Sequence, residues 1–95
     1  MASGKPIADV MLKHLDRFQY IKIDKILWEL RIENFLENQE YHQIIKKDIP
    51  EKVTYLVEEI PRKGDGAFQT FLTLLEKYDH RALVKSLREG ERTYI

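Results

Sequence analysis

The most constraining feature of this sequence is a short glycine turn with the apolar spacing of an α-helix on both sides. Residues at i, i+3, i+4 and i+7 share one helix face. Two such sets flank the turn: Val53, Leu56, Val57 and Ile60 precede it, and Phe68, Phe71, Leu72 and Leu75 follow it. Gly64 and Gly66 lie in the connection. Helices joined this closely are expected to pack antiparallel, so the turn predicts a compact helical domain.

Helical spacing recurs along the rest of the chain, and no stretch alternates long enough to predict a strand. We therefore predict an all-α fold of six short helices. The first is expected to bend between Phe18 and Lys22, where aromatic and β-branched residues interrupt the period. The expected buried faces of the first, second, third and sixth helices are Ala8, Met11, Leu12 and Leu15; Ile23, Ile26, Leu27 and Leu30; Tyr41, Ile44 and Ile45; and Leu83, Val84 and Leu87.

Capping residues set the expected helix boundaries. Side chains that can accept a hydrogen bond from a first-turn N–H group predict N-caps at Asp24, Asn38, Asp48, Asp65 and Asp79. Asp48 stands three residues before Glu51 in a capping-box arrangement. Pro61 is expected to kink or end the fourth helix, and Gly90 is expected to end the sixth.

Length and composition bound the class of protein. The 95 residues suit one domain, expected over residues 6–90 with flexible ends at 1–5 and 91–95. The 16 Lys and Arg residues balance 16 Asp and Glu residues, which argues against a dedicated nucleic-acid binder. The chain has no cysteine and no long apolar run, so we expect no disulfide, no membrane contact and a cytoplasmic location.

Catalytic and metal-binding patterns are missing from the sequence. No two of the histidines, His14, His42 and His80, stand four residues apart on a helix. The segment 64–66 lacks the other residues of a phosphate-binding loop. We therefore expect no catalytic residue, no cofactor and no metal.

Charge is distributed unevenly although its sum is zero. Residues 29–40 carry four glutamates and one arginine, a net charge of −3. Residues 1–25 and 77–92 each carry a net charge of +2. This pattern indicates either an ordinary solvated surface or a bipolar module that binds a partner of opposite charge.

Several segments resemble the caspase recruitment domain (CARD) of the death-fold superfamily. The similar segments are Ile23–Leu30, Asn38–Ile44, Glu51–Leu56, the junction Arg62–Leu72, and Leu83–Leu87. The junction carries a basic-Gly, Ala-Phe and Phe-Leu order that is similar to many CARDs. The resemblance spans Ile7 to Leu87 and is closest to the CARDs of adaptors and initiator caspases. It implies a six-helix antiparallel bundle of Greek-key type, with a kinked first helix.

The resemblance also implies a function. CARDs pair asymmetrically, the second and third helices of one domain docking on the first and fourth helices of another. We expect a module that recruits a CARD-containing caspase, adaptor or sensor in apoptotic or inflammatory signalling, with possible self-association into oligomers or filaments. The acidic side is expected to use Asp24, Glu29, Glu33, Glu37 and Glu40, and the basic side Lys13, Arg17, Lys52, Arg62 and Lys63.

Two alternatives remain at this stage. One is a helical nucleic-acid-binding domain that uses Arg62, Lys63, Arg81, Lys85 and Arg88. The other is a small metal-binding or catalytic helical protein that uses the histidines. Among the aromatic residues, Trp28 is expected at the edge of the core, and Tyr55 is expected to point outward.

Overall fold

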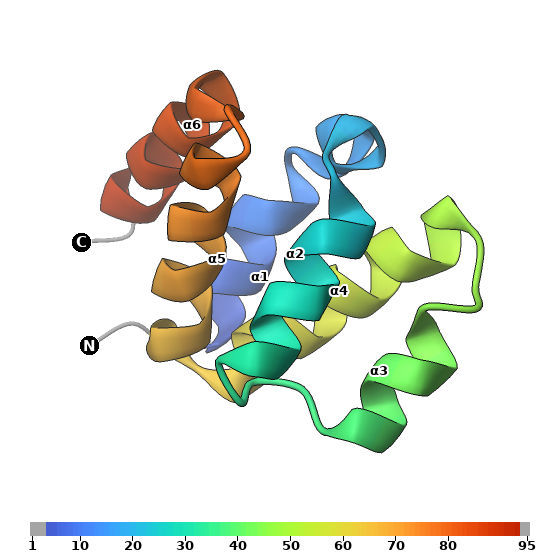
Figure 1. Ribbon diagram of the computed structural model, residues 1–95. Helices are drawn as coiled ribbons and strands as arrows, with labels where there is room; N and C mark the ends of the chain where they lie inside the picture. Colours follow the sequence, from blue (N-terminus) through green and yellow to red (C-terminus); the bar gives the residue numbers. More distant parts are fainter. Residues whose placement is uncertain (1–3, 94–95) are drawn as a thin grey trace.

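The computed structural model describes residues 4–93, which form six α-helices and one 3₁₀ helix and contain no strand. The elements are α1 (Gly4–Leu12), η1 (Leu15–Tyr20), α2 (Ile23–Ile32), α3 (Asn38–Ile44), α4 (Ile49–Lys63), α5 (Asp65–Lys77) and α6 (Arg81–Thr93) (Figure 1). The all-α prediction is therefore confirmed. Residues 4–5 and 91–93, expected in flexible ends, belong to α1 and α6, and the other residues of those ends lie outside the described range.

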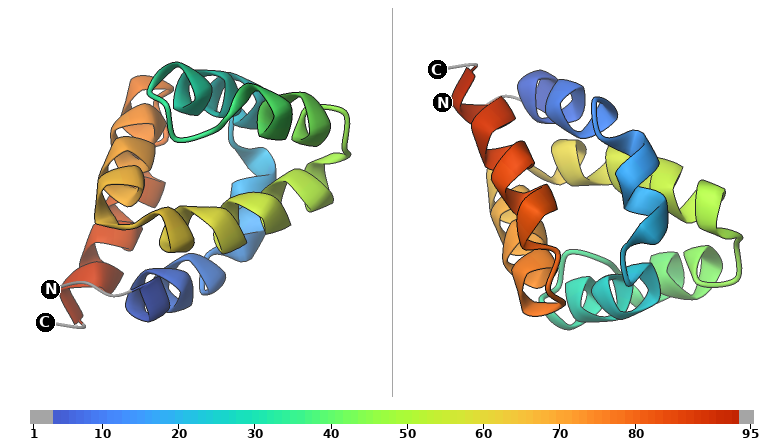
Figure 2. Two further views of the ribbon diagram at one scale, coloured as in Figure 1. Left: turned by 90° about the horizontal axis from the view of Figure 1, so that it is seen from below. Right: turned by 90° about the horizontal axis from the view of Figure 1, so that it is seen from above.

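The helices surround one apolar core. Figure 2 shows α1 beside α4 and α5 beside α6, with α2 and α3 along another side. Phe18, Phe68 and Phe71 are among the largest fully buried side chains of the core. The ring centres of Phe18 and Phe71 lie 5.7 Å apart. The start of α1 and the end of α6 lie near each other, on the side away from α3. The buried faces predicted for α2, α4, α5 and α6 are confirmed.

The first helix is interrupted, as predicted, but at a different place. Its α-helical part ends at Leu12, and the chain continues as the 3₁₀ helix η1 after His14. Leu12, expected on the buried face, is 53% exposed, whereas Ile7, Val10 and Met11 are buried. The true face thus begins one residue earlier, and η1 turns Phe18 into the core.

The glycine turn joins α4 and α5 differently from the prediction. Helix α4 runs through Pro61 to Lys63, because a proline near the C-terminal end removes only one hydrogen bond of the ladder. Gly64, with φ of 102°, is the single residue between the helices, and only glycine adopts such a conformation readily. Figure 2 shows that α5 leaves α4 at a steep angle, so the two are not antiparallel.

Most of the predicted N-caps are displaced. Asp48 is confirmed, since its Oδ1 accepts the N–H of Glu51 at 3.1 Å. The N-cap positions of α2, α3 and α5 fall instead on Lys22, Glu37 and Gly64. Each helix starts earlier than its capping signal, so Asp24, Asn38 and Asp65 lie inside the first turn.

Asp79 closes α5 rather than capping α6. It has a φ of 67°, the N–H of His80 donates to the Leu75 carbonyl at 2.8 Å, and the N–H of Asp79 donates to Glu76 at 3.0 Å. This is the Schellman arrangement, whose left-handed position usually holds glycine. Asn34, also with φ of 67°, closes α2 in the same way.

Gly90 lies inside α6, so the prediction that it ends this helix is wrong. A Cβ at this position would lie 3.0 Å from Cγ1 of Val10. The residue therefore allows α6 to approach α1 closely. Packing, rather than helix termination, explains the glycine.

Candidate protein-interaction surface

The acidic residues predicted for the interface differ in availability. Glu33 follows the end of α2 and Glu37 is the N-cap of α3, and both are exposed. The other three carboxylates, those of Asp24, Glu29 and Glu40, are engaged within the chain. Of the five residues, Glu33 and Glu37 are thus the pair whose side chains make no bond to another helix, although Glu37 also takes part in the capping box of α3.

Asp24 is paired with a residue predicted for the opposite side of the interface. The Nζ atom of Lys52 on α4 lies 2.6 Å from Oδ1 of Asp24 on α2. The Lys52 side chain is 8% exposed and that of Asp24 is 64% exposed. Lys52 is therefore a buried link between α2 and α4, not an exposed basic group as expected.

Glu40 joins α3 to α4. Its carboxylate accepts the N–H of Glu37 at 3.1 Å and the hydroxyl of Tyr55 at 2.9 Å, and it lies 3.6 Å from Nζ of Lys63. The hydrogen bond from the Glu37 N–H lowers the pKa of Glu40. Burial opposes this lowering, and Tyr55 and Lys63 reinforce it. Burial raises the pKa of Tyr55, and the bond to Glu40 raises it further. Tyr55 is half-buried and packs against the core, whereas the sequence predicted that it points outward.

Glu29 joins α2 to α5. Its two oxygens lie 2.7 Å from Nζ of Lys77, and it also accepts a short hydrogen bond from the Tyr78 hydroxyl. The bond from Lys77 lowers the pKa of Glu29, and the bond from Tyr78 lowers it further. Glu29 is thus committed to holding two helices together.

The remaining basic residues predicted for the interface lie at three places. Lys13 is exposed at the end of α1, and Arg17 on η1 donates to Ser86 Oγ at 2.9 Å. Arg62 is 74% exposed and lies 3.2 Å from Glu59. With Lys52 and Lys63 paired internally, the first and fourth helices present less positive charge than the sequence suggested.

Two exposed apolar side chains lie on α2, and the second of them, Ile32, borders the same surface cavity as Glu37. Trp28 is 45% exposed and Ile32, one turn later on α2, is 56% exposed. The guanidinium of Arg31 lies 4.3 Å from the Trp28 ring centre and 5.4 Å from that of Tyr41. We call the exposed surface formed by Trp28, Ile32, Glu33 and Glu37 the α2–α3 patch.

Trp28, expected at the edge of the core, is nearly half exposed, and Ile32 was missed. A signal was present for both residues. Neither one fits the i, i+3, i+4, i+7 set that begins at Ile23 and ends at Leu30. An apolar residue that lies off the buried period of an amphipathic helix is expected to face solvent.

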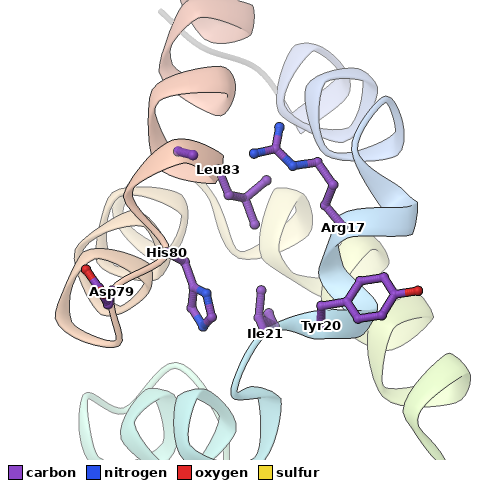
Figure 3. Close-up of a pocket in the computed structure, with 7 residues that line it drawn as sticks. Arg17, Tyr20, Ile21, Asp79, His80 and Leu83 are labelled. Carbon is purple, nitrogen blue, oxygen red and sulfur yellow. The ribbon is translucent and has the colours of Figure 1, made fainter.

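A cavity of about 350 Å³ lies between η1 and the start of α6. Figure 3 shows Arg17 extending toward α6, and the ring of His80 on the side of Ile21. Nε2 of His80 accepts the N–H of Lys22 at 3.2 Å, and burial lowers the pKa of His80, as does Lys22. Arg17 is hydrogen-bonded to Ser86 and His80 to the backbone of Lys22, so both side chains help to hold the fold together.

The described residues form no site for either alternative function, nucleic-acid binding or metal binding and catalysis. Lys63 precedes α5 and Arg81 follows it, so the five cations of the nucleic-acid hypothesis are split by a helix about 20 Å long. No group of three or more metal-ligating side chains occurs among the residues that the structure describes. Over the same residues, no helix is both long and apolar enough to cross a membrane.

Comparison with known proteins identifies one related family. A family model described as the caspase recruitment domain matches residues 10–90. Among curated proteins and among solved structures, no match is found.

Proposed function

This chain belongs to the caspase recruitment domain (CARD) family, and from that premise we propose that its α2–α3 patch binds another CARD-containing protein. The domain is a homotypic interaction module, not a catalytic one. Its role would be to bring a caspase, adaptor or sensor to a signalling assembly in the cytoplasm, in an apoptotic or inflammatory response. The patch, rather than the whole predicted acidic side, carries this proposal.

The observation that supports it is the exposure of two large apolar side chains on α2, Trp28 and Ile32, together with the exposed acids Glu33 and Glu37 that follow them in the chain. Tryptophan, tyrosine and arginine are enriched at interface positions that contribute most to affinity. The guanidinium of Arg31 lies over the Trp28 ring and the Tyr41 ring meets it edge-on, so these contacts reduce the side-chain entropy that Trp28 can lose on binding. Glu33 and Glu37 would add charge-dependent steering toward a basic surface.

The chain's own first and fourth helices are a poor match for this patch. Lys52 is buried against Asp24, and Lys63 is paired with Glu40. A partner CARD with free arginines or lysines on its corresponding helices would fit better. We therefore expect hetero-association through this pair of surfaces to be stronger than self-association.

The test is binding of this domain to a panel of isolated CARDs from caspases, adaptors and sensors. Trp28→Ala should weaken binding to a positive partner by about 30-fold, the equivalent of about 2 kcal/mol. Glu33→Lys with Glu37→Gln should abolish most of the salt-dependent part of binding. Gln is used at residue 37 because a lysine at the N-terminus of α3 would oppose the helix dipole.

A matched control makes the same change in charge outside the patch. Asp16→Lys with Glu58→Gln alters two exposed acids on η1 and α4 and should leave binding within about twofold, the range of surface substitutions. Thermal unfolding of every variant checks that the fold is intact. Equal binding by the folded patch variants and the wild type would refute the assignment.

A further inference from the structure

Helix α6 carries a row of cations that the proposed function does not use. Arg81, Lys85, Arg88 and Arg92 stand at i, i+4, i+7 and i+11 and are exposed, so they follow one face of the helix. At a rise of about 1.5 Å per residue, the row is about 16 Å long. The same cations border a surface cavity of about 420 Å³, where the buried Val84 adds an apolar wall. We call the four cations and this cavity the basic α6 stripe.

The cations at the two ends of the stripe and one between them are only weakly committed within the chain. Among the side chains that the structure describes, Lys85 and Arg92 have no ion-pair partner. Arg81 lies 3.6 Å from Asp79, and both are more than 80% exposed. Exposed pairs of this kind contribute little free energy, so a carboxylate from another molecule can replace the internal one.

Two acids share the border of the cavity without cancelling its charge. Glu76 lies 3.2 Å from Arg88, and both side chains are about half exposed. Glu89 is exposed on α6. With four cations and two acids, the border carries a net charge of +2. A positive border around an apolar wall favours a ligand that is anionic and partly apolar.

An anionic membrane is a poor match for this surface. A basic helix binds a membrane surface by burying its apolar face among the lipids. The apolar face of α6 consists of Leu83, Val84 and Leu87, which are already buried in the domain. The helix packs with this face against α1 and α5, so it has none to insert.

A single-stranded nucleic acid is also a poor match. Such ligands combine phosphate contacts with the stacking of bases on aromatic side chains. None of the described side chains that border the cavity is aromatic. The stripe therefore offers charge to a phosphate chain but no surface on which its bases can stack.

An acidic peptide fits the stripe in both spacing and chemistry. An extended chain rises about 3.3 Å per residue and places every second side chain on one face, so that alternate side chains are about 6.6 Å apart. Arg81 and Lys85 are about 6 Å apart along the helix axis, as are Arg88 and Arg92. Carboxylates on alternate peptide residues can meet these cations, and an apolar side chain between the carboxylates can contact Val84.

We propose that the basic α6 stripe binds an acidic peptide segment of another protein, in extended form and with an apolar residue between its carboxylates. This site goes beyond the proposed function. It shares no residue with the α2–α3 patch, so either assignment can fail while the other holds.

The experiment measures fluorescence anisotropy of a labelled synthetic peptide at 50 and 500 mM salt. The peptide is about nine residues long, which covers the stripe at about 3.3 Å per residue. It carries leucine at its centre, glutamate at the other alternate positions and serine between them. Affinity for the wild-type domain should fall at least tenfold at the higher salt concentration, where charge interactions are screened. Replacement of the central leucine by serine should weaken binding at least threefold, since the contact with the apolar wall is lost.

Variants of the domain locate the site. Lys85→Gln with Arg92→Gln should weaken peptide binding about tenfold, without breaking an internal ion pair of the described residues. Lys46→Gln with Lys47→Gln, at exposed positions between α3 and α4, makes the same change in charge and should bind the peptide as the wild type does. Thermal unfolding of both variants checks that the fold is intact.

Three results would overturn the inference. One is no binding of the peptide by the wild type at 50 mM salt. Another is equal weakening by the two pairs of substitutions, which would show a response to net charge alone. The third is equal or tighter binding of single-stranded DNA, or of vesicles that contain anionic lipid, because the stripe would then attract any anion.

Discussion

The ammonium group of Lys52 on α4 is buried and lies 2.6 Å from the carboxylate of Asp24, which is mostly exposed on α2. Removal of the acid leaves a buried positive charge without its partner. Removal of the base leaves only an exposed acid, which water solvates. The two halves of the pair are therefore expected to have unequal effects on stability.

Asp24→Ala should lower the free energy of unfolding by about 1–3 kcal/mol, less than a fully buried pair would because Asp24 is largely exposed. Lys52→Met keeps most of the buried stem and should cost less than about 1 kcal/mol. Urea unfolding at neutral pH measures both. The opposite order, with Lys52→Met the more damaging change, would contradict this description of the pair.

Glu40 should make the domain sensitive to acid. The pKa of Glu40 in the folded chain lies below its ordinary value of 4.5, so the unfolded chain takes up the proton first. Its contribution is then complete above about pH 4.5 and is lost as the pH falls through the folded-state pKa. Glu40→Gln should flatten the pH dependence of unfolding below pH 4.5. An unchanged slope in that range would show that other acids dominate.

His80 should give a second dependence on pH, near neutrality. Its folded-state pKa lies below the ordinary 6.5, chiefly because of burial, so protonation favours the unfolded chain. The contribution is complete above pH 6.5 and falls as the pH drops through the folded-state pKa. His80→Gln should reduce the difference between urea midpoints at pH 7.5 and 5.5. Some difference should remain, since the pKa of His14 is also lowered by burial, and by Arg17 and Lys13.

Gly90→Ala should destabilise the domain although alanine favours helices. Both methyl groups of Val10 would lie within 3.4 Å of the new Cβ, so rotation of that buried side chain exchanges one close contact for another. Crowding of about 1–3 kcal/mol should outweigh the gain in helix propensity of about 1 kcal/mol. Thermal unfolding of the pair Gly90→Ala and Val10→Ala should show that the second change relieves the first. Simple additivity of the two losses would argue against the contact.

Asp79→Gly should stabilise the domain by about 0.5–1 kcal/mol, because glycine adopts the left-handed conformation of this position without the cost that a side chain brings. The exposed pair with Arg81 that is lost contributes little. Asp79→Ala is the control, since it removes the charge but keeps a Cβ. Equal stability of the two variants would show that conformation is not the determinant.

The sequence predicted buried faces well and long-range polar pairs not at all. The faces of α2, α4, α5 and α6 depend on spacing within one helix, which periodicity reports directly. The pair of Asp24 and Lys52 joins residues 28 positions apart and depends on how helices are arranged in space. The sequence of α4 alone therefore predicts an exposed Lys52, because it does not show that α2 lies beside this residue.

Helix ends were the other source of error. A capping side chain is needed only where it can reach a free N–H group, and the N-cap position of α3 holds Glu37 although Asn38 follows it. Glycine was also ambiguous. Gly64 supplies a left-handed conformation, whereas Gly90 supplies room for Val10, and the sequence signals of the two are alike.

The near meeting of the start of α1 and the end of α6 has a practical consequence for anything fused to this domain. A reporter or enzyme attached through a short linker at either end would stand beside α6 and away from α3. The fused protein should cover the cations of α6 and leave Trp28 and its neighbours accessible to a partner. Linker length, rather than the choice of end, should then decide how far a fusion obstructs α6.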